Sequence, residues 1–371
     1  MVAGLGAGEW ARRTGTVPVA ACTVTKLAWL ARHEPDTFAS VRSVLLPHDY
    51  LTYRLTGRRV TDRGDASGTC YYDPSADAWL PDLLAQVVGP ADWPALLPSV
   101  LGPTAAVGPV VGAGESGLDV GPVGTVGPGT GDNMAAALGL GIAPGRVCVS
   151  VGTSGTVSTR SDRPTADPTG AVAGFADAAG GFLPLVCTLN ATRVLGAVGR
   201  LLGVTPGGLD DLALAAASGA SGLTLLPYLD GERTPDRPGA TGTLAGIRSD
   251  VTREDLARAA VEGVVCGLLD GFDALAAVVP VTDGPLVLVG GGARSPAVRR
   301  VLADLSGRPV LVADAPEAVA TGAAVQAAAV LTGRSLARVQ EDWGLGGGAL
   351  VEPDGSVDAG AVRQAYAALR G

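Results

Sequence analysis

The sequence predicts an α/β fold with a mixed or parallel sheet, because strand-like and helical segments alternate in its second half. The clearest helix covers residues 252–279, where apolar side chains recur every three or four positions and Thr252 with Asp255 forms a capping box. The pattern continues with a buried strand at 286–290, a turn at Gly291–Gly292, a helix from Ser295–Pro296, a strand at 309–312 and a helix at 316–331.

The first half of the chain contains a helical region followed by a glycine-rich stretch. Residues 23–57 predict a helix, a short strand-like run at 44–46 and a second helix that ends at Gly57. Residues 101–131 are rich in Gly, Pro and Val, which predicts loop, a short strand and a glycine turn before a helix at 133–140.

Length and composition indicate a globular protein with two domains. The chain has 371 residues, of which 47% are hydrophobic and 17% charged, so there is ample apolar side chain for a packed core. The formal net charge is −9 and the basic residues form no cluster beyond pairs, which argues against nucleic acid or an anionic membrane as a partner. The sequence has no apolar run of membrane-spanning length and no signal-peptide core, so we expect a cytoplasmic protein.

The side chains present exclude several classes of active site. Lys26 is the only lysine and no GxxxxGK[ST] motif surrounds it, which excludes a P-loop kinase. His33 and His48 are the only histidines, and both are expected to be surface or packing residues. This scarcity argues against serine or cysteine hydrolases and against histidine-based metal sites. The five cysteines are widely spaced without a CxxC pair, which favours reduced structural thiols.

Glycine turns beside strands are the remaining places where backbone N–H groups could meet phosphate oxygens. Residues 147–159 predict a β-hairpin with the turn GTSGT at Gly152–Thr156, for which an ordinary hairpin turn is the simpler interpretation when it is taken alone. GGGA at Gly290–Ala293 lies between a strand and a helix, where the helix N-terminus favours anions or the backbone accommodates a flat base. GLGGGA at 344–349 follows no strand and is expected to be a surface loop.

A carboxylate and an amide directly follow another glycine turn, GTGDN at Gly129–Asn133, at the start of an expected helix. An aspartate in this place can serve as a helix N-cap, which is the more common role for an isolated residue. The alternative is a general base that accepts the proton of a hydroxyl group. The order of the turns along the chain, GTGDN, then GTSGT, then GGGA after a long helix, bears on this choice.

This order resembles the FGGY carbohydrate kinases, whose fold pairs two ribonuclease-H-like domains of the actin/hexokinase ATPase type around an ATP-binding cleft. The resemblance covers nearly the whole chain. KLAWLARHE at 26–34 is similar to the family's first signature, although Ala21, just before this segment, differs from the residue usual in the family. GTLAGIRSDVTREDLARAAVE at 242–262 matches the second signature throughout. PHDYLTYRLTG, TDRGDASGTCYYD, LLPYLDGERTP and VLVGGGARSP are most similar to the members that phosphorylate xylulose.

The resemblance implies roles for individual residues. Asp132 would be the catalytic base that deprotonates the sugar hydroxyl, and Asn133 would adjoin it in the sugar site. Nucleotide binding would fall to the turns, with Gly152 and Thr153 at the γ-phosphate and Gly291, Gly292 and Ala293 along the adenosine. Structural roles are implied for Asp230, Gly231, Glu232 and Arg233 at the cleft wall and for Glu317, Gly322 and Ala323 in packing at the nucleotide site.

The resemblance also implies a first domain without its initial strands. Family members begin with a strand and a DxGT turn, whose aspartate helps to hold Mg²⁺ and phosphate, and no DxGT occurs in this chain. We therefore expect an incomplete amino-terminal domain at 1–141 and a carboxy-terminal domain with nucleotide-binding loops at 142–371. On this basis we expect little or no sugar kinase activity from the chain by itself. A misplaced start codon or gene decay would explain the missing strands.

The function implied by the resemblance is ATP-dependent phosphorylation of a ketopentose, with D-xylulose as the favoured substrate. The implied cofactors are ATP and Mg²⁺, with no side chain assigned to the metal. Another FGGY sugar kinase, of ribulokinase or gluconokinase type, and an inactive nucleotide-binding remnant are the alternatives. The expected partner is a small-molecule sugar, and the sequence leaves a homodimer open.

Overall fold

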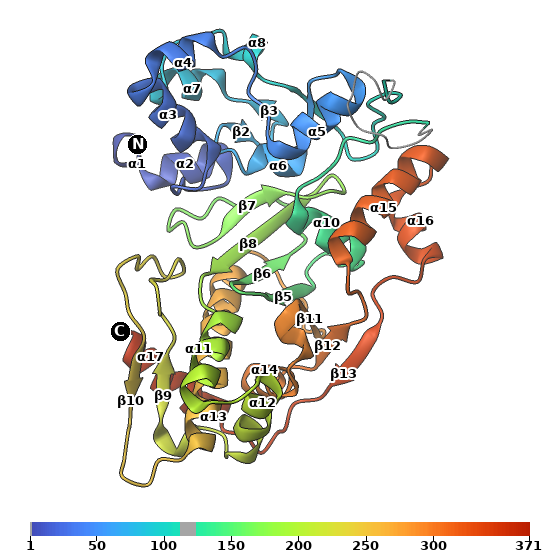
Figure 1. Cartoon of the computed structure of the whole chain (residues 1–371). Helices are drawn as coiled ribbons and strands as arrows, with labels where there is room; N and C mark the ends of the chain where they lie inside the picture. Colours follow the sequence, from blue (N-terminus) through green and yellow to red (C-terminus); the bar gives the residue numbers. More distant parts are fainter. Residues whose placement is uncertain (1, 112–123) are drawn as a thin grey trace. The chain divides into compact units, whose positions relative to one another are not determined.

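The computed structural model describes residues 2–111 and 124–371 and is shown in Figure 1. The chain divides into two compact units. Unit 1 comprises Met1–Pro144, Arg160–Pro184 and Glu317–Gly346, whereas unit 2 comprises Gly145–Thr159, Leu185–Pro316 and Gly347–Gly371. Each unit draws on several segments of the chain, and the expected domain boundary at residues 141 and 142 stays a prediction. None of the helices in the described ranges is long and apolar enough to cross a membrane.

Unit 2 is built on a mixed β-sheet, as the alternation of strands and helices predicts. β5 (Val147–Val151) and β6 (Gly155–Thr159) form the expected antiparallel hairpin, and β8 (Phe182–Thr188) pairs antiparallel with β6. On the other side of β5 the order continues with β11 (Leu286–Val289) and β12 (Val310–Ala313), both parallel to β5, and then the antiparallel β13 (Gly348–Val351).

The long helix α13 (Arg253–Ala276) is central to unit 2, where it contacts α11, α12, α14 and β6. Its capping box is present as predicted: Thr252 Oγ1 accepts a hydrogen bond from the Asp255 backbone N–H, and Asp255 accepts one from the Thr252 backbone N–H. The other elements of this unit are α11 (Thr192–Leu202), α12 (Pro206–Ala215), α14 (Pro296–Ser306), α17 (Ala359–Arg370) and the antiparallel pair β9 (Thr224–Leu226) and β10 (Thr243–Ala245).

Unit 1 begins with short helices packed around an aromatic core. Trp10, Tyr71 and Trp93 are almost fully buried there, together with Leu83 and Leu84. The helices are α1 (Val2–Leu5), α2 (Ala7–Thr14), α3 (Thr23–His33), α4 (Pro35–Ser40), α5 (Pro47–Thr56), α6 (Arg63–Ser67), α7 (Pro81–Val87) and α8 (Trp93–Leu96). The strands are β1 (Val60–Asp62), which pairs parallel with β4 (Ser99–Leu101), β2 (Tyr72–Asp73), antiparallel to β3 (Ala78–Trp79), and β7 (Ala173–Ala176).

The remaining helices of unit 1 are α10 (Asp132–Gly139), α15 (Ala318–Thr332) and α16 (Leu336–Asp342). α10 and α15 pack closely because glycines lie at their contact. A Cβ on Gly139 would overlap the carbonyl oxygen of Ala318. This contact fixes α10, the helix that begins at the predicted base.

Two sequence predictions of local structure are wrong. Residues 44–46 are not a strand, because their backbone hydrogen bonds are isolated: Val44 N donates to Leu96 O and Tyr50 N donates to Leu46 O, each at 2.9 Å. The segment 344–349 is only partly loop, because β13 begins at Gly348 and pairs with the edge of β12. That pairing requires glycine, since a Cβ on Gly348 would overlap the carbonyl oxygen of Val312. By contrast, none of the five cysteines, all within the described ranges, forms a disulfide.

Candidate functional site

Asp132 is the first residue of α10 and its side chain is exposed. The N-cap is the preceding Gly131, so Asp132 is not in the capping position that an isolated aspartate would often take. Its Oδ1 accepts hydrogen bonds from the backbone N and the side-chain Nδ2 of Asn133, at 2.7 and 2.9 Å. Both recorded hydrogen bonds fall on Oδ1, so Oδ2 is the oxygen suited to accept a proton.

The turn before Asp132 packs against a histidine and a carboxylate of unit 1. A Cβ on Gly131 would lie 2.5 Å from Oδ1 of Asp65, and one on Gly129 would lie 3.7 Å from the ring of His48. Gly129 also has a φ of 79°, a backbone conformation that residues other than glycine rarely adopt. The glycines of GTGDN therefore serve the close approach of the turn to these two side chains.

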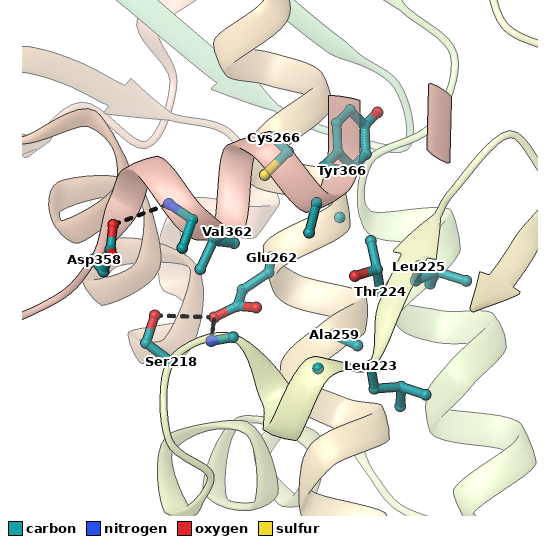
Figure 2. A pocket seen from close by; sticks show the side chains of 15 residues that line it. Ser218, Leu223, Thr224, Leu225, Ala259, Glu262, Cys266, Asp358, Val362 and Tyr366 are labelled. Carbon is teal, nitrogen blue, oxygen red and sulfur yellow. Dashed lines mark hydrogen bonds between the residues drawn. The ribbon is translucent and has the colours of Figure 1, made fainter. Parts of the chain in front are cut away.

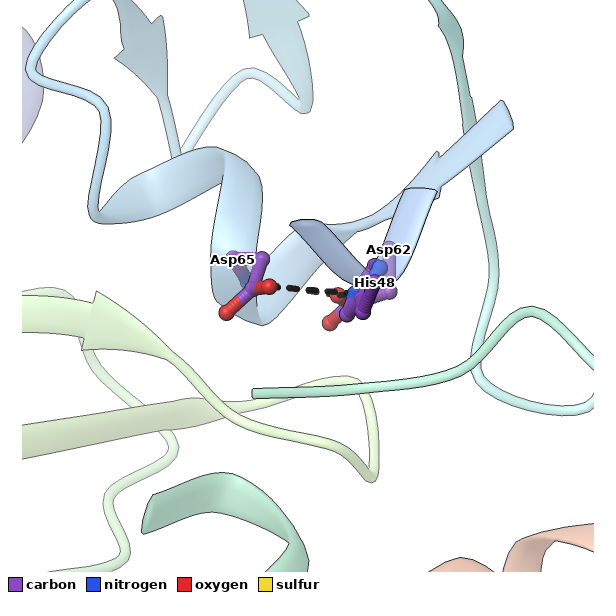
Figure 3. A group of neighbouring side chains, drawn as sticks. All are labelled: His48, Asp62 and Asp65. Carbon is purple, nitrogen blue, oxygen red and sulfur yellow. Dashed lines mark hydrogen bonds and ion pairs between the residues drawn. The ribbon is translucent and has the colours of Figure 1, made fainter. Parts of the chain in front are cut away.

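His48 lies among three carboxylates, as Figure 3 shows for two of them. Its Nε2 is 2.9 Å from Oδ1 of Asp62 and 3.1 Å from Oδ2 of Asp65, while its Nδ1 is 2.9 Å from Oδ1 of Asp49. Burial by itself lowers the pKa of His48, but the three carboxylates raise that pKa to about 10. His48 is therefore a cation at neutral pH.

The pKa of Asp65, which pairs with His48 in this group, is raised. Burial raises the pKa of Asp65 to about 6, against the opposing effect of the His48 cation. The neighbouring charges of Asp62, Asp49 and Asp132 raise this pKa further. Asp65 is thus electrostatically coupled to the predicted base.

This group was missed at the level of sequence, where His48 was interpreted as a surface or packing residue. The available signal was the short spacing of Asp62 and Asp65 in TDRGD, which places both carboxylates at one helix start. Within the described chain, His48, Asp62 and Asp65 are a group with spacing suited to a metal ion. Mg²⁺ prefers oxygen ligands and keeps several waters, so a site in which one of the three donors is an imidazole nitrogen does not fit Mg²⁺.

In unit 2 the GTSGT turn joins β5 to β6. Gly152 donates its N–H to the carbonyl oxygen of Ser154 at 2.9 Å, and its own carbonyl accepts from the backbone N and Oγ1 of Thr192. Thr153 is exposed, and its carbonyl accepts from Ala191 N at 3.2 Å. The turn is therefore tied to the start of α11.

GGGA in unit 2 lies between β11 and α14, with Gly291–Arg294 forming a short 3-10 helix. Gly290 has a φ of 88°, and a Cβ there would lie 2.8 Å from the carbonyl oxygen of Val151. Gly292 is equally confined, because its Cβ would lie 2.5 Å from Cγ1 of Val151. Glycine thus lets this turn lie directly on the end of β5, next to the GTSGT turn.

A cavity of about 510 Å³ opens beside this turn within unit 2. Small and apolar residues of α11 and α12 form much of its wall, and Arg200 and Arg294 add positive charge. Ser295, the N-cap of α14, donates a hydrogen bond to Asp210 at this cavity. Gly291 and Gly292 line it, whereas Ala293 is buried beside them. A flat, largely apolar ring with a charged group attached would suit such a wall.

A second cavity in unit 2, of about 230 Å³, lies between α13 and α17 and is shown in Figure 2. The carboxylate of Glu262 reaches it and accepts hydrogen bonds from Gly219 N at 2.9 Å and Arg258 Nε at 2.7 Å. Glu262 and Arg258 are both buried and neutralise each other. The polar groups at this cavity therefore stabilise the fold, and we assign it no part in the chemistry.

The residues expected in structural roles have different surroundings, and their roles at the cleft wall and the nucleotide site stay predictions. Glu232 is buried and accepts hydrogen bonds from Leu189 N and Asn190 Nδ2, whereas Asp230 forms an exposed ion pair with Arg193. Glu317 is the N-cap of α15, and Ala323 is exposed on that helix. Gly322 packs against α10 in unit 1.

Comparisons with known proteins agree with this arrangement. The FGGY family of carbohydrate kinases, N-terminal domain, matches residues 5–139, and the C-terminal domain of the same family matches residues 147–331. The chain is 48% identical to the "Xylulose kinase" of Streptomyces coelicolor over 94% of its own length and 69% of that protein.

Solved structures give the same result. The chain is similar to the xylulose kinase from Bifidobacterium adolescentis with a TM-score of 0.81 and 40% identity, covering 98% of this chain and 75% of that one. The corresponding values for a kinase from Brucella ovis, titled "xyloylose kinase", are 0.88 and 31%, with coverage of 97% and 74%. These folds are two-domain sugar kinases of the expected α/β type. The chain belongs to the FGGY family of carbohydrate kinases.

Proposed function

We propose that the protein catalyses the ATP-dependent phosphorylation of D-xylulose to D-xylulose 5-phosphate. The observation that carries this proposal is the 48% identity to a xylulose kinase. It is supported by the exposed Asp132 at the start of α10, which the resemblance implies to be the base. The relatives with the clearest similarity are all named for the same sugar. We also propose that the reaction takes place in the cytoplasm.

In the proposed reaction Asp132 accepts the proton of the sugar hydroxyl as it attacks the γ-phosphate. Oδ1 is oriented by Asn133, so Oδ2 takes the proton, and Asn133 also lies in position to bind a neighbouring sugar hydroxyl. A carboxylate of this kind raises the rate by about 10² to 10⁴-fold. Oδ2 of Asp132 would thus be the atom that receives the proton.

The nucleotide is assigned to unit 2. The purine would lie in the cavity beside Gly291, Gly292 and Ala293, where glycine backbone forms a flat wall. Gly152 and Thr153 would face the γ-phosphate from the GTSGT turn, with the Thr153 hydroxyl as a donor. Mg²⁺ would arrive with the phosphates and neutralise their charge, and no side chain of this chain is assigned to it.

The test is sugar-dependent release of ADP, with D-xylulose, D-ribulose, gluconate and glycerol compared as acceptors. It is run on the chain alone and on the chain with a relative's amino-terminal DxGT segment joined in front, because the chain contains no DxGT. We expect D-xylulose to give the highest kcat/KM in the active preparation. Faster turnover of another acceptor would assign a different substrate, and no turnover with any acceptor in either preparation would contradict a kinase function.

A further inference from the structure

Each ring nitrogen of His48 lies close to at least one carboxylate oxygen. Nε2 faces Asp62 and Asp65 while Nδ1 faces Asp49, all within 3.1 Å. Carboxylates accept hydrogen bonds and do not donate them, whereas a neutral imidazole has a single N–H. The hydrogen bond of the ring is at Nε2, to Asp62, whereas Nδ1 and Asp49 are an ion-pair contact without hydrogen-bond geometry. These three close carboxylates favour the imidazolium, in agreement with the raised pKa of His48.

Two of the carboxylates around this ring are held rigidly by backbone N–H groups. Asp49 accepts from Leu46 N at 2.8 Å, and Asp62 accepts from Gly64 N at 2.6 Å and Asp65 N at 3.3 Å. Asp49 and Asp62 are also buried, whereas 28% of the Asp65 side chain is exposed. Asp65 is therefore the member of the group that depends most on His48 for its position.

The group is in direct contact with the turn that carries the predicted base. The ring of His48 lies against Gly129 and the Asp65 carboxylate lies against Gly131, one residue before Asp132. Gly64, at the start of α6, also lies close to Met134 of α10, since a Cβ added to Gly64 would lie 2.9 Å from Cγ of Met134. The turn and the first part of α10 thus rest on the elements that hold His48.

We propose that His48 is a positioning residue for the phosphoryl transfer: its cation holds Asp65 beneath the Gly129–Gly131 turn and balances negative charge next to Asp132. The proposal rests on the proposed function for the role of Asp132. Three carboxylates surround one cation in this group, and Asp132 adds a fourth negative charge in its vicinity. Without the cation, Asp65 would hold its proton to a higher pH and would lose the ion pair that keeps it beneath the turn.

The experiment follows the aspartate carboxyl carbons by ¹³C NMR as the pH is varied, in the full chain without sugar or nucleotide. The Asp132 signal is identified by its loss in Asp132→Asn, and the Asp65 signal by its loss in Asp65→Asn. The test variant is His48→Gln, which removes the cation and keeps a polar side chain. The matched control is His33→Gln, because His33 is the only other histidine and lies on the exposed end of α3.

We expect the titration midpoint of Asp65 to rise in His48→Gln, by roughly half a pH unit or more, as for the loss of a nearby unit charge. His33→Gln should leave this midpoint unchanged. The Asp132→Asn variant is a second test, which leaves His48 unchanged. It should lower the titration midpoint of Asp65, because the negative charge of Asp132 raises the pKa of Asp65 and the coupling between two sites is reciprocal. If an active preparation is obtained, kcat in His48→Gln should fall more than the KM for ATP changes.

Unchanged midpoints in a folded His48→Gln protein would overturn the proposal. If that variant does not fold, the Asp65 midpoint in Asp132→Asn decides, and an unchanged value there would equally overturn it. These readouts require no turnover, so they remain decisive even if another sugar, or no sugar, is phosphorylated. A loss of kcat with unchanged midpoints would mean that His48 has only a structural role.

Discussion

Gly322 of α15 lies directly against Ala135 of α10, so closely that a Cβ on Gly322 would overlap the carbonyl oxygen of Ala135. Gly139 stands in the same relation to Ala318 on the opposite helix. Two glycines, one on each helix, thus allow the backbones to touch. Because α10 begins at Asp132, this packing determines where the predicted base lies within unit 1.

The substitution Gly322→Ala should destabilise the protein, because the methyl group can be accommodated only if α10 and α15 move apart. Overpacking of this kind costs about 1 to 3 kcal/mol, which exceeds the roughly 1 kcal/mol that alanine gains over glycine in a helix. The measurement is the free energy of unfolding in urea. The matched control is Gly207→Ala in α12, where a Cβ meets nothing within 4 Å and stability should stay equal or rise. Equal stability of the two variants would mean that the helix contact is loose.

Local sequence signals predicted the elements that depend on few distant contacts. The capping box at Thr252 and the helical periodicity after it define α13, and the β-branched runs around Gly152 define the β5–β6 hairpin. The Asp132 helix start was also predicted, within one residue of its observed position. These features arise from hydrogen bonds and periodicity between near neighbours in the chain.

The features that were missed depend on contacts between distant segments. The apolar run at 44–46 resembles a strand in isolation, but its backbone bonds singly to Leu96 on one side and to the start of α5 on the other. β13 forms because β12 offers an unpaired edge, which no pattern within 344–349 reveals. The His48 group needs α5, β1 and α6 to converge beneath the turn at 129–131, so a single histidine in PHDY gave no indication of it.

In an active preparation, Asp132→Asn should lower kcat by about 10² to 10⁴-fold, because the amide cannot accept the hydroxyl proton. ATP affinity should stay close to that of the parent, since Asp132 lies in unit 1 and the proposed purine cavity lies in unit 2. The measurements are steady-state kinetics with D-xylulose and calorimetric titration with ATP. Asp358→Asn, at the N-cap of α17, serves as a control for an aspartate at a helix start. Parental kcat in Asp132→Asn would remove Asp132 from the mechanism.

The stability supplied by His48 should depend on pH in a defined direction. The carboxylates raise the pKa of His48 to about 10, against an ordinary value of about 6.5 in the unfolded chain. The folded state therefore binds this proton more tightly, so the stabilisation is complete below pH ~6.5 and is lost as the pH rises through ~10. The difference in unfolding free energy between the parent and His48→Gln should shrink steadily over that window. A difference that stays constant from pH 7 to 10 would contradict an imidazolium in the fold.

Blocking the cavity of unit 2 should weaken ATP binding, and the structure indicates which glycine to change. A bulky residue at Gly292 would strike Val151 of β5, so a loss of binding there could reflect disturbed packing. Gly291 is exposed, lines the same cavity, and the nearest atom to its Cβ position is Nη2 of Arg294 at 3.8 Å. Gly291→Leu therefore fills the space beside the turn while leaving the sheet intact.

We expect Gly291→Leu to raise the Kd for ATP about tenfold or more, which corresponds to at least ~1.4 kcal/mol of lost binding free energy. The reason is steric, because the proposed site lets the purine lie flat against glycine backbone and a leucine side chain would occupy that space. Calorimetry on the full chain measures the change without any need for turnover. Gly284→Leu is the matched control, since it places the same side chain in a loop of unit 2 at the other end of β11, which does not line the cavity. Equal ATP affinity in Gly291→Leu and the parent, with the same melting temperature, would place the adenosine elsewhere. Weaker binding in both variants would instead point to a general loss of structure in unit 2, so only a selective effect at Gly291 supports the assignment.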